Sequence, residues 1–351
     1  MDYTKILKRA WHILWHYPSL WVIGFILAFV GGGSSGGNPS GQTFYRFNQN
    51  DFRNGKGFPD GRNGNWQRII ERINTYMDTH FGNINESVIL TWAIAAFVVI
   101  MLIVIVFTIL KYVALAAHFR MVNNLEETGN KVSWSKGLKG GWSKAAFRLW
   151  LIDLVVIIPT TLTILVLFGC AAIPFLLGIG AGDAATAAGI IASIGIGMVV
   201  FLVIIIAVTV INLWLRFAHR ICVLENKGVL ESLKNAWFVL RHSLKDIALT
   251  WLILVGVRIA FGIVSIPIVL VLVGIAVAVV GGLGLGVYAL GTQISAGLII
   301  LGVVLMILLL AIPITFVSGL GESFFESTWT LVYREIKLRT TLAAIPSESA
   351  V

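Results

Sequence analysis

The sequence is poor in charge and cysteine. Only 12% of its 351 residues are charged and only two are cysteine, whereas 58% are hydrophobic and the mean hydropathy is +0.90. Two cysteines are too few for a disulfide framework. The low charge and high hydropathy exclude a typical soluble domain. Because the apolar runs are long and continuous rather than short and alternating, they favour membrane-spanning helices over a β-barrel. The composition therefore predicts an all-α, polytopic membrane protein.

Six apolar runs predict six transmembrane helices. The runs form pairs. Short turns are expected near residues 178–186 and 281–286 in the second and third pairs, whereas a long external segment joins the first pair. Several runs exceed the ~20 residues that cross a bilayer core, so tilt, proline kinks or extensions into water are expected. The runs cover about residues 18–32, 87–117, 149–177, 187–215, 247–280 and 287–317.

A short motif recurs before three of these runs. Leu-Lys-x-x-Trp occurs at residues 7–11, 138–142 and 233–237, each time in a stretch with an amphipathic helical pattern. This predicts three repeats, each an interfacial helix followed by a helical hairpin. The motif supplies six candidate interfacial anchors, because Trp prefers the headgroup level and Lys reaches lipid phosphate. Topological anchoring is the simpler interpretation, and specific lipid recognition is the alternative. The anchors are Lys8, Trp11, Lys139, Trp142, Lys234 and Trp237.

The basic residues predict the orientation. Eighteen of the 26 lie in the N-terminal segment, the second-to-third and fourth-to-fifth connections, and the C-terminal segment. Arg216 and Arg220 are counted among those of the fourth-to-fifth connection. All of these segments lie on one side of the membrane, so the positive-inside rule places both termini in the cytoplasm.

The chain is expected to form a single membrane domain over residues 1–351. Residues 31–64, rich in Gly, Asn, Ser and Asp, are expected to form a flexible external loop. Residues 65–82 carry apolar side chains at helical spacing and predict an external amphipathic helix. That helix either packs at an interface or binds a partner. The small, polar residues 340–351 are expected to be a disordered tail.

Three ionisable residues at membrane depth are the candidate functional site, because charge there is costly. Arg258 is the deepest, in the fifth run, while Asp153 and Lys111 lie in the third and second runs. The similar depth of Asp153 and Lys111 makes an ion pair plausible. Arg258 is expected to bind a backbone carbonyl, water or an anionic group. A structural role in helix packing competes with a role in transport.

The sequence also resembles a known family. Residues 225–237, read after 220–224, resemble a stretch of the bacterial glycerophosphoryl diester phosphodiesterase membrane domain and of related multi-pass membrane proteins. Residues 333–339 are similar to that family's terminal Tyr-x-x-x-x-x-Arg segment. The resemblance begins near residue 117. It implies a membrane module, since in the true phosphodiesterases the chemistry belongs to a separate soluble barrel domain, which this sequence lacks. No functional residue is carried over.

The sequence thus favours a non-catalytic module of the bacterial inner membrane, either an accessory subunit or a lipid-associated scaffold. A transporter or channel for a small or anionic solute, with Arg258 in its pathway, is the alternative. An intramembrane enzyme ranks third, because no nucleophile with a base and no ligand cluster is visible. No catalytic residue, metal site or cofactor is expected, and nucleic acid is not an expected partner. The expected partners are the lipid bilayer, with anionic headgroups and a membrane protein as candidates.

Overall fold

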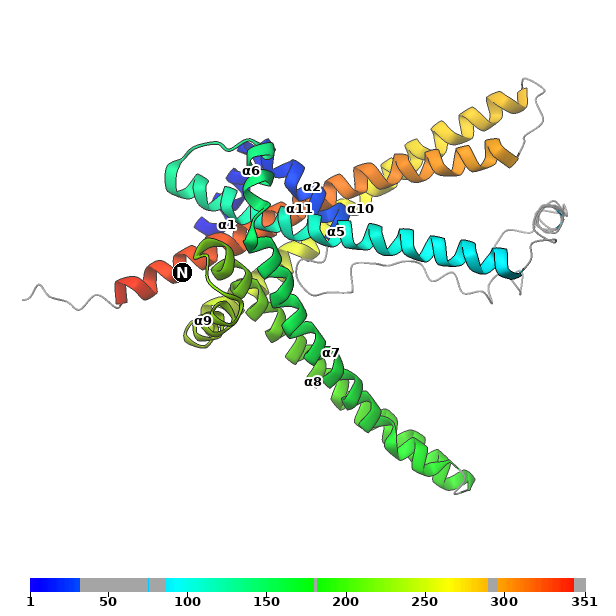
Figure 1. Cartoon of the computed structure of the whole chain (residues 1–351), viewed down its shortest axis with the longest axis horizontal. Helices are drawn as coiled ribbons and strands as arrows, with labels where there is room; N and C mark the ends of the chain where they lie inside the picture. The colour runs from blue at the N-terminus through cyan, green and yellow to red at the C-terminus, as the bar shows by residue number, and fades with distance from the viewer. Residues whose placement is uncertain (32–74, 76–85, 180–181, 290–295, 344–351) are drawn as a thin grey trace, which may run out of the picture. The chain divides into compact units, whose positions relative to one another are not determined.

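The described part of the chain is entirely helical in its regular structure. A computed structural model describes residues 1–31, 75, 86–179, 182–289 and 296–343 (Figure 1). Within these ranges the helices are α1 (Tyr3–His16), α2 (Pro18–Gly31), α5 (Glu86–Thr128), α6 (Trp134–Gly141), α7 (Lys144–Gly178), α8 (Asp183–Leu224), α9 (Val229–His242), α10 (Leu244–Ala289) and α11 (Ala296–Ala343).

Five of the described helices are long and apolar enough to cross a membrane. Their apolar spans are 35 to 44 residues long, well beyond the ~20 that a bilayer core requires. Helices suit this environment because they satisfy their backbone hydrogen bonds internally. The chain is therefore a multi-pass membrane protein. The spans are Leu90–Thr128, Lys144–Gly178, Asp183–Leu224, Leu244–Val287 and Ile299–Thr340.

The N-terminal run does not form a straight span. Helices α1 and α2 are bent by 97° relative to each other, and the pair counts as a sixth span only if both are taken together. Helix α2 has 14 residues, about 21 Å, which is shorter than the ~30 Å bilayer core. The break lies at Tyr17, because Pro18 disfavours helical geometry in the residue before it. Proline itself suits the first position of α2.

Several helices extend beyond the predicted runs. Helix α10 continues through residues 281–286, so the turn predicted there is wrong. The other predicted turn is confirmed, because α7 ends at Gly178 and α8 begins at Asp183. Helix α11 remains helical to Ala343, past the expected start of the tail at residue 340. The rest of that tail lies outside the described residues.

Helix α8 also runs further than predicted, to Leu224. Arg216 and Arg220 therefore lie inside a helix, and their assignment to a connecting segment is wrong. The reason is that α8 does not end where its apolar run ends. It continues into a part of the protein where neighbouring helices cover its polar residues.

The chain divides into two compact units, residues 1–37 with 108–351, and residues 38–107. In the second unit the structure describes Thr75 and the first half of α5 from Glu86 onward. The side chains from Leu90 to Phe107 are all exposed. Apart from Gly31 and Thr75, the expected loop at 31–64 and amphipathic helix at 65–82 lie outside the described residues.

Helix pairs organise the first unit. Helices α7 and α8 lie side by side, as do α10 and α11, and α2 packs along α11 (Figure 1). Glycines bring α2 and α11 into close contact. A Cβ atom on Gly319 would lie 2.7 Å from the backbone nitrogen of Phe25 and 2.8 Å from the carbonyl carbon of Gly24. Small residues permit this close approach, as they commonly do between membrane helices.

The buried core of this unit is gathered around the short helices. Helices α1, α2 and α9 contribute fully buried side chains such as Ile13, Ile23 and Leu240. The most apolar windows of the long spans, by contrast, are at most 17% buried within the chain. Lipid or another protein must therefore cover those windows.

Candidate functional site

One stretch of α11 is buried at every position. From Gly321 to Tyr333, which we call the central segment, each residue is shielded by neighbouring helices. A helix buried all round is usually apolar. The central segment instead carries six buried polar residues, and buried polar groups require partners. They are Glu322, Ser323, Glu326, Ser327, Thr328 and Thr330.

The Arg220–Glu326 ion pair lies at the centre of these contacts. Nη2 of Arg220 is 2.6 Å from Oε2 of Glu326, and both side chains are at most 2% exposed. The other guanidinium nitrogens donate to the Arg216 carbonyl at 2.7 Å and to the Thr330 hydroxyl at 3.3 Å. The guanidinium also lies over the Phe119 ring, 4.5 Å from its centroid. Arg220 is thus fully engaged, as a buried charge requires.

Two further arginines extend this pair into an ionic cluster of Arg216, Arg220, Arg258, Glu322 and Glu326. Nη1 of Arg216 is 3.3 Å from Oε1 of Glu326. Nη2 of Arg258 is 3.6 Å from Oε1 of Glu322, and its guanidinium stacks over the Phe325 ring. Oε2 of Glu322 is buried without a hydrogen-bond partner among the described residues. The cluster is therefore fully paired at Glu326 and partly paired at Glu322.

A separate polar group surrounds Asp153. One carboxylate oxygen is 2.7 Å from Nε2 of His219, and the other accepts the Tyr112 hydroxyl at 2.6 Å. Asp153 is thus paired with His219, where the sequence analysis expected Lys111. The Lys111 ammonium lies 5.4 Å from the centroid of the Tyr112 ring instead. Both carboxylate oxygens are engaged, which makes this a closed contact between α5, α7 and α8.

The three predicted site residues therefore belong to two different groups. Arg258 contributes to the ionic cluster, whereas Asp153 and Lys111 lie around Tyr112. Sequence reasoning missed Glu322, Glu326 and His219. A signal was present, because Glu322 and Glu326 are four residues apart on α11. Arg216 and Arg220 have the same spacing on α8, so each helix carries charges of one sign on one face. In the structure both arginines pair with Glu326.

All six predicted anchors are exposed. Trp142 is the most open of the three tryptophans, at 70% exposure. Trp11 packs edge to face against Trp15 and Phe324, and Trp237 packs against Trp214. The anchor rings thus combine contacts within the chain with a large exposed area, the arrangement expected of aromatic side chains at a membrane interface.

A third polar group follows the last residue of α8. The carboxylate of Glu225 lies 3.1 Å from Nζ of Lys227 and 2.9 Å from Nζ of Lys337, and it accepts the Tyr333 hydroxyl. Burial alone would raise the pKa of Glu225, but hydrogen bonds from Tyr333, Lys337 and Lys227 lower it to about 2. The same contact raises the pKa of Lys227. The group is therefore charged at neutral pH.

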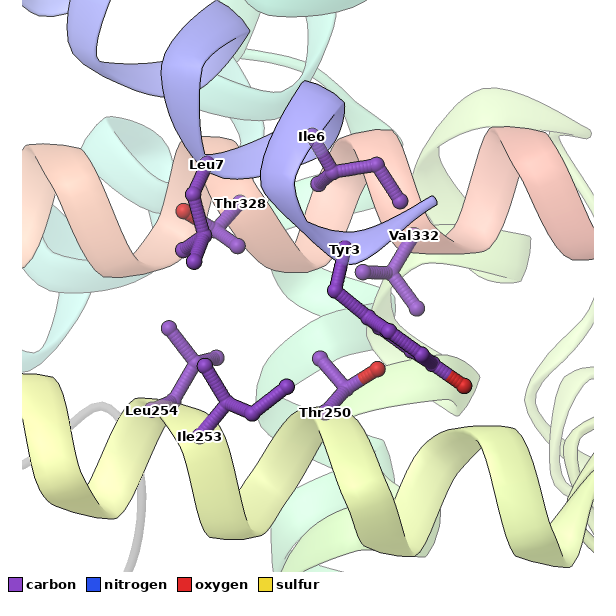
Figure 2. A pocket seen from close by; sticks show the side chains of 8 residues that line it. All are labelled: Tyr3, Ile6, Leu7, Thr250, Ile253, Leu254, Thr328 and Val332. Atoms are coloured by element: carbon purple, nitrogen blue, oxygen red, sulfur yellow. The ribbon is translucent and has the colours of Figure 1, made fainter. Parts of the chain in front are cut away.

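Two cavities border these elements. A cavity of ≈190 Å³ is lined by Glu225, Lys227 and Lys337 together with neighbouring residues of α8, α9 and α11. The other, of ≈10 Å³, is a crevice in which side chains of α1, α10 and α11, including Leu7 and Thr328, face one another (Figure 2). Because a single water needs about 10–15 Å³, that crevice has room for one at most. Arg258 lines neither of the two.

Metal-binding chemistry finds no support in the described part of the chain, where no three His, Cys, Asp or Glu side chains form a group that could hold an ion. His12 and His16, which have the four-residue spacing of a metal pair, stack with ring centroids 3.8 Å apart. His118 is fully buried, with neither ring nitrogen hydrogen-bonded to a described residue.

Comparison with known proteins identifies a family. Residues 14–337 match the family described as "Family of unknown function (DUF7544)", and the chain belongs to it. No curated protein and no solved structure matches the chain. The matched range includes the central segment, the ionic cluster and the Asp153 group.

Proposed function

We propose that this protein is a non-catalytic integral membrane module, acting as an accessory subunit or a lipid-associated scaffold of the bacterial inner membrane. The observation that carries the proposal is the pairing of the buried charges. Arg220, Glu326 and Asp153 are each bound by side chains of neighbouring helices. Charges committed in this way hold helices together and are not available to a passing solute.

The exposed apolar windows support the same proposal. The most apolar stretches of three of the five spans are 0% buried within the chain. A transporter that encloses its substrate needs helices packed around a central site. Helices that expose so many apolar side chains present surfaces that lipid or partner subunits can cover. A relationship to the phosphodiesterase membrane domain, which we propose as well, would also place the chain among membrane modules.

The proposal includes a six-span topology of three units with both termini in the cytoplasm. Short helices α1, α6 and α9 each precede an apolar helix, in the order that the threefold motif predicts. Helices α7 and α10 are long, whereas α2 has the same 14 residues as α1. The pair α1 and α2 would then act as the first span despite its bend. The exposed Lys8, Lys139 and Lys234 would face the anionic inner leaflet, in keeping with the positive-inside rule.

A transporter or channel for a small or anionic solute is the second candidate. One observation favours it: the Arg258 side chain is 38% exposed and its partner Glu322 retains an unpaired carboxylate oxygen. An arginine held loosely at membrane depth could bind an anion. Neither of the two cavities described above includes Arg258, so the loose pairing of this arginine is the observation on which the transport route depends.

The two functions are distinguished by reconstituting the protein in vesicles and measuring anion flux together with copurifying subunits. The module predicts no flux above that of protein-free vesicles, and a stable protein partner or bound lipid. Flux that Arg258→Ala abolishes, that Arg258→Lys retains in part and that Lys245→Ala leaves unchanged would overturn it. Lys245 is the matched control because it is exposed on the same helix, α10.

A further inference from the structure

The cavity at the end of α8 combines apolar walls with charged groups. Its volume is ≈190 Å³. Ile221, Phe238, Val239 and Ile336 form the apolar part of the lining. The polar part consists of Glu225, Lys227, Asn235, Tyr333, Lys337 and Thr340. A pocket of this kind suits a ligand that has one charged group and an apolar remainder.

Basic side chains outnumber acidic ones in the lining of the cavity, which includes Lys227 and Lys337 but only one acid, Glu225. Lys227 and Lys337 each have three ammonium protons, and the carboxylate of Glu225 lies within 3.1 Å of both nitrogens. Glu231 is a second acid, 3.6 Å from Lys227, but its side chain is 59% exposed and the pair is worth little. Asn235 adds amide protons. The cavity therefore has protons to offer to an anion that carries several acceptor oxygens.

The surroundings of the cavity resemble those of a membrane interface. Its lining comes from the C-terminal end of α8, from α9 and from the C-terminal part of α11, beyond the apolar runs predicted at 187–215 and 287–317. Trp237 and Phe238, on the adjacent helix α9, are 45% and 53% exposed. Exposed aromatic rings next to basic side chains mark the boundary between hydrocarbon and water. A ligand could therefore enter the cavity from the lipid phase as well as from water.

We propose that this cavity binds a phosphate anion, carried by an anionic phospholipid headgroup or supplied as free phosphate. The ammonium groups of Lys227 and Lys337 and the amide of Asn235 hold the phosphate oxygens, and Ile336 and Val239 contact the apolar atoms next to it. The cavity is smaller than a typical site for a whole small molecule, ~300–1,000 Å³, so it takes a headgroup and not an entire lipid. The inference rests on the proposed lipid-associated module and gives it a specific site.

The test is native mass spectrometry of the full chain released from nanodiscs of phosphatidylcholine with phosphatidylglycerol. Wild-type protein should retain one phosphatidylglycerol after bulk lipid has been removed. The double variant Lys227→Gln with Lys337→Gln should bind it about 25-fold more weakly, since a lysine near the surface contributes roughly a fivefold effect. The control variant Lys136→Gln with Lys245→Gln removes the same number of charges at exposed lysines that neither line the cavity nor belong to the anchors, and it should stay within about twofold of wild type.

A second variant separates binding from folding. Val239→Trp fills the cavity without changing its charges and should also abolish retention, while the unfolding temperature shows whether each variant remains folded. Retention that is unchanged in both cavity variants, or lost equally in the control variant with Lys136→Gln and Lys245→Gln, would overturn the site.

A competition arm distinguishes the two sources of phosphate. Displacement of the retained lipid by millimolar inorganic phosphate would assign the site to free phosphate. Retention in its presence would assign the site to the lipid. The two proposals can fail separately. If the cavity binds no phosphate and the vesicles show no anion flux, the membrane-module proposal still stands. If the vesicles show flux that depends on Arg258, the module is contradicted whatever the cavity binds.

Discussion

The first half of helix α11 exposes apolar side chains, whereas its second half buries polar ones. Ile300 and Leu301 in the first half are each 64% exposed, whereas Glu326 and Thr330 in the central segment are 2% and 0% exposed. In water this distribution would be reversed. Lipid or a partner protein covers the first half, whereas neighbouring helices cover the second half and satisfy its polar groups through ion pairs and hydrogen bonds. One continuous helix thus passes between two environments, and its stability depends on different forces in each.

The largest change in stability is expected when one partner of the buried ion pair is removed from the second half. Glu326→Gln leaves Arg220 buried without a counter-charge, and we expect a loss of about 3–5 kcal/mol in unfolding free energy. Denaturant unfolding in detergent measures it. The matched control is Glu335→Gln on the same helix, where the pair with Arg339 is partly exposed and should contribute about 0.3–0.5 kcal/mol. Equal effects from the two variants would mean that burial of the charge is unimportant.

A second test concerns the Asp153 group, which also lies buried among helices. Tyr112→Phe removes the hydroxyl that donates to Asp153 at 2.6 Å, and bonds to charged groups typically contribute about 1.5–3 kcal/mol. We therefore expect a loss in that range, again from denaturant unfolding. An unchanged unfolding free energy would show that His219 alone satisfies the carboxylate.

A third test sharpens the contrast along α11 by adding one methyl group in each half. Gly319→Ala places a Cβ atom 2.7 Å from backbone atoms of α2, and such overpacking costs about 1–3 kcal/mol. At Gly302→Ala the nearest atom, on the Val280 side chain, is 3.6 Å away, so unfolding should be unaffected or slightly more difficult. Thermal unfolding of the two variants compares them directly. Similar values would argue against close packing between α2 and α11.

The smallest change in unfolding free energy is expected around Glu225, directly after the last residue of α8. Its folded pKa of about 2 lies below the ~4.3 of an unfolded chain, so its pairing stabilises the protein fully above pH 4.3. That contribution is lost as the pH falls towards 2. This pKa difference alone would correspond to about 3 kcal/mol. Because solvent screens the partly exposed Lys227 and Lys337, we expect the difference between wild type and Glu225→Gln at pH 7 to be only about 1 kcal/mol. The unfolding temperatures of wild type and Glu225→Gln should approach each other as the pH falls from 4 to 2.5. A difference that grows on acidification would contradict the lowered pKa of Glu225.

The sequence predicted the membrane part of the fold well, because apolar length alone identifies a span. The long helices of the described residues begin within about five residues of the predicted runs, except α11, which begins later than expected because α10 continues to Ala289. The helix ends were harder to place. Arg216 and Arg220 look like loop residues in a sequence, since nothing local shows that Glu326 will neutralise them from α11.

The candidate site was predicted only in part for the same reason. Arg258 and Asp153 stand out because they interrupt apolar runs. Glu322 and Glu326 lie where the hydropathy falls, so they resemble ordinary residues at the end of a span. Their role depends on contacts with α8 and α10, which are distant in sequence. The matched spacing of two acids and two arginines was the available signal, and it becomes meaningful once the helices are known to be adjacent.

The most direct test of the account is a double-mutant cycle on Arg220 and Glu326, measured by denaturant unfolding. If the central segment is organised by this buried pair, Arg220→Met and Glu326→Leu should each cost about 3–5 kcal/mol. Their combination should recover most of that loss, because no buried charge of the pair remains unpaired. If the two costs simply add, the pair does not organise the central segment, and its charges would have to be explained by a function other than holding the helices together.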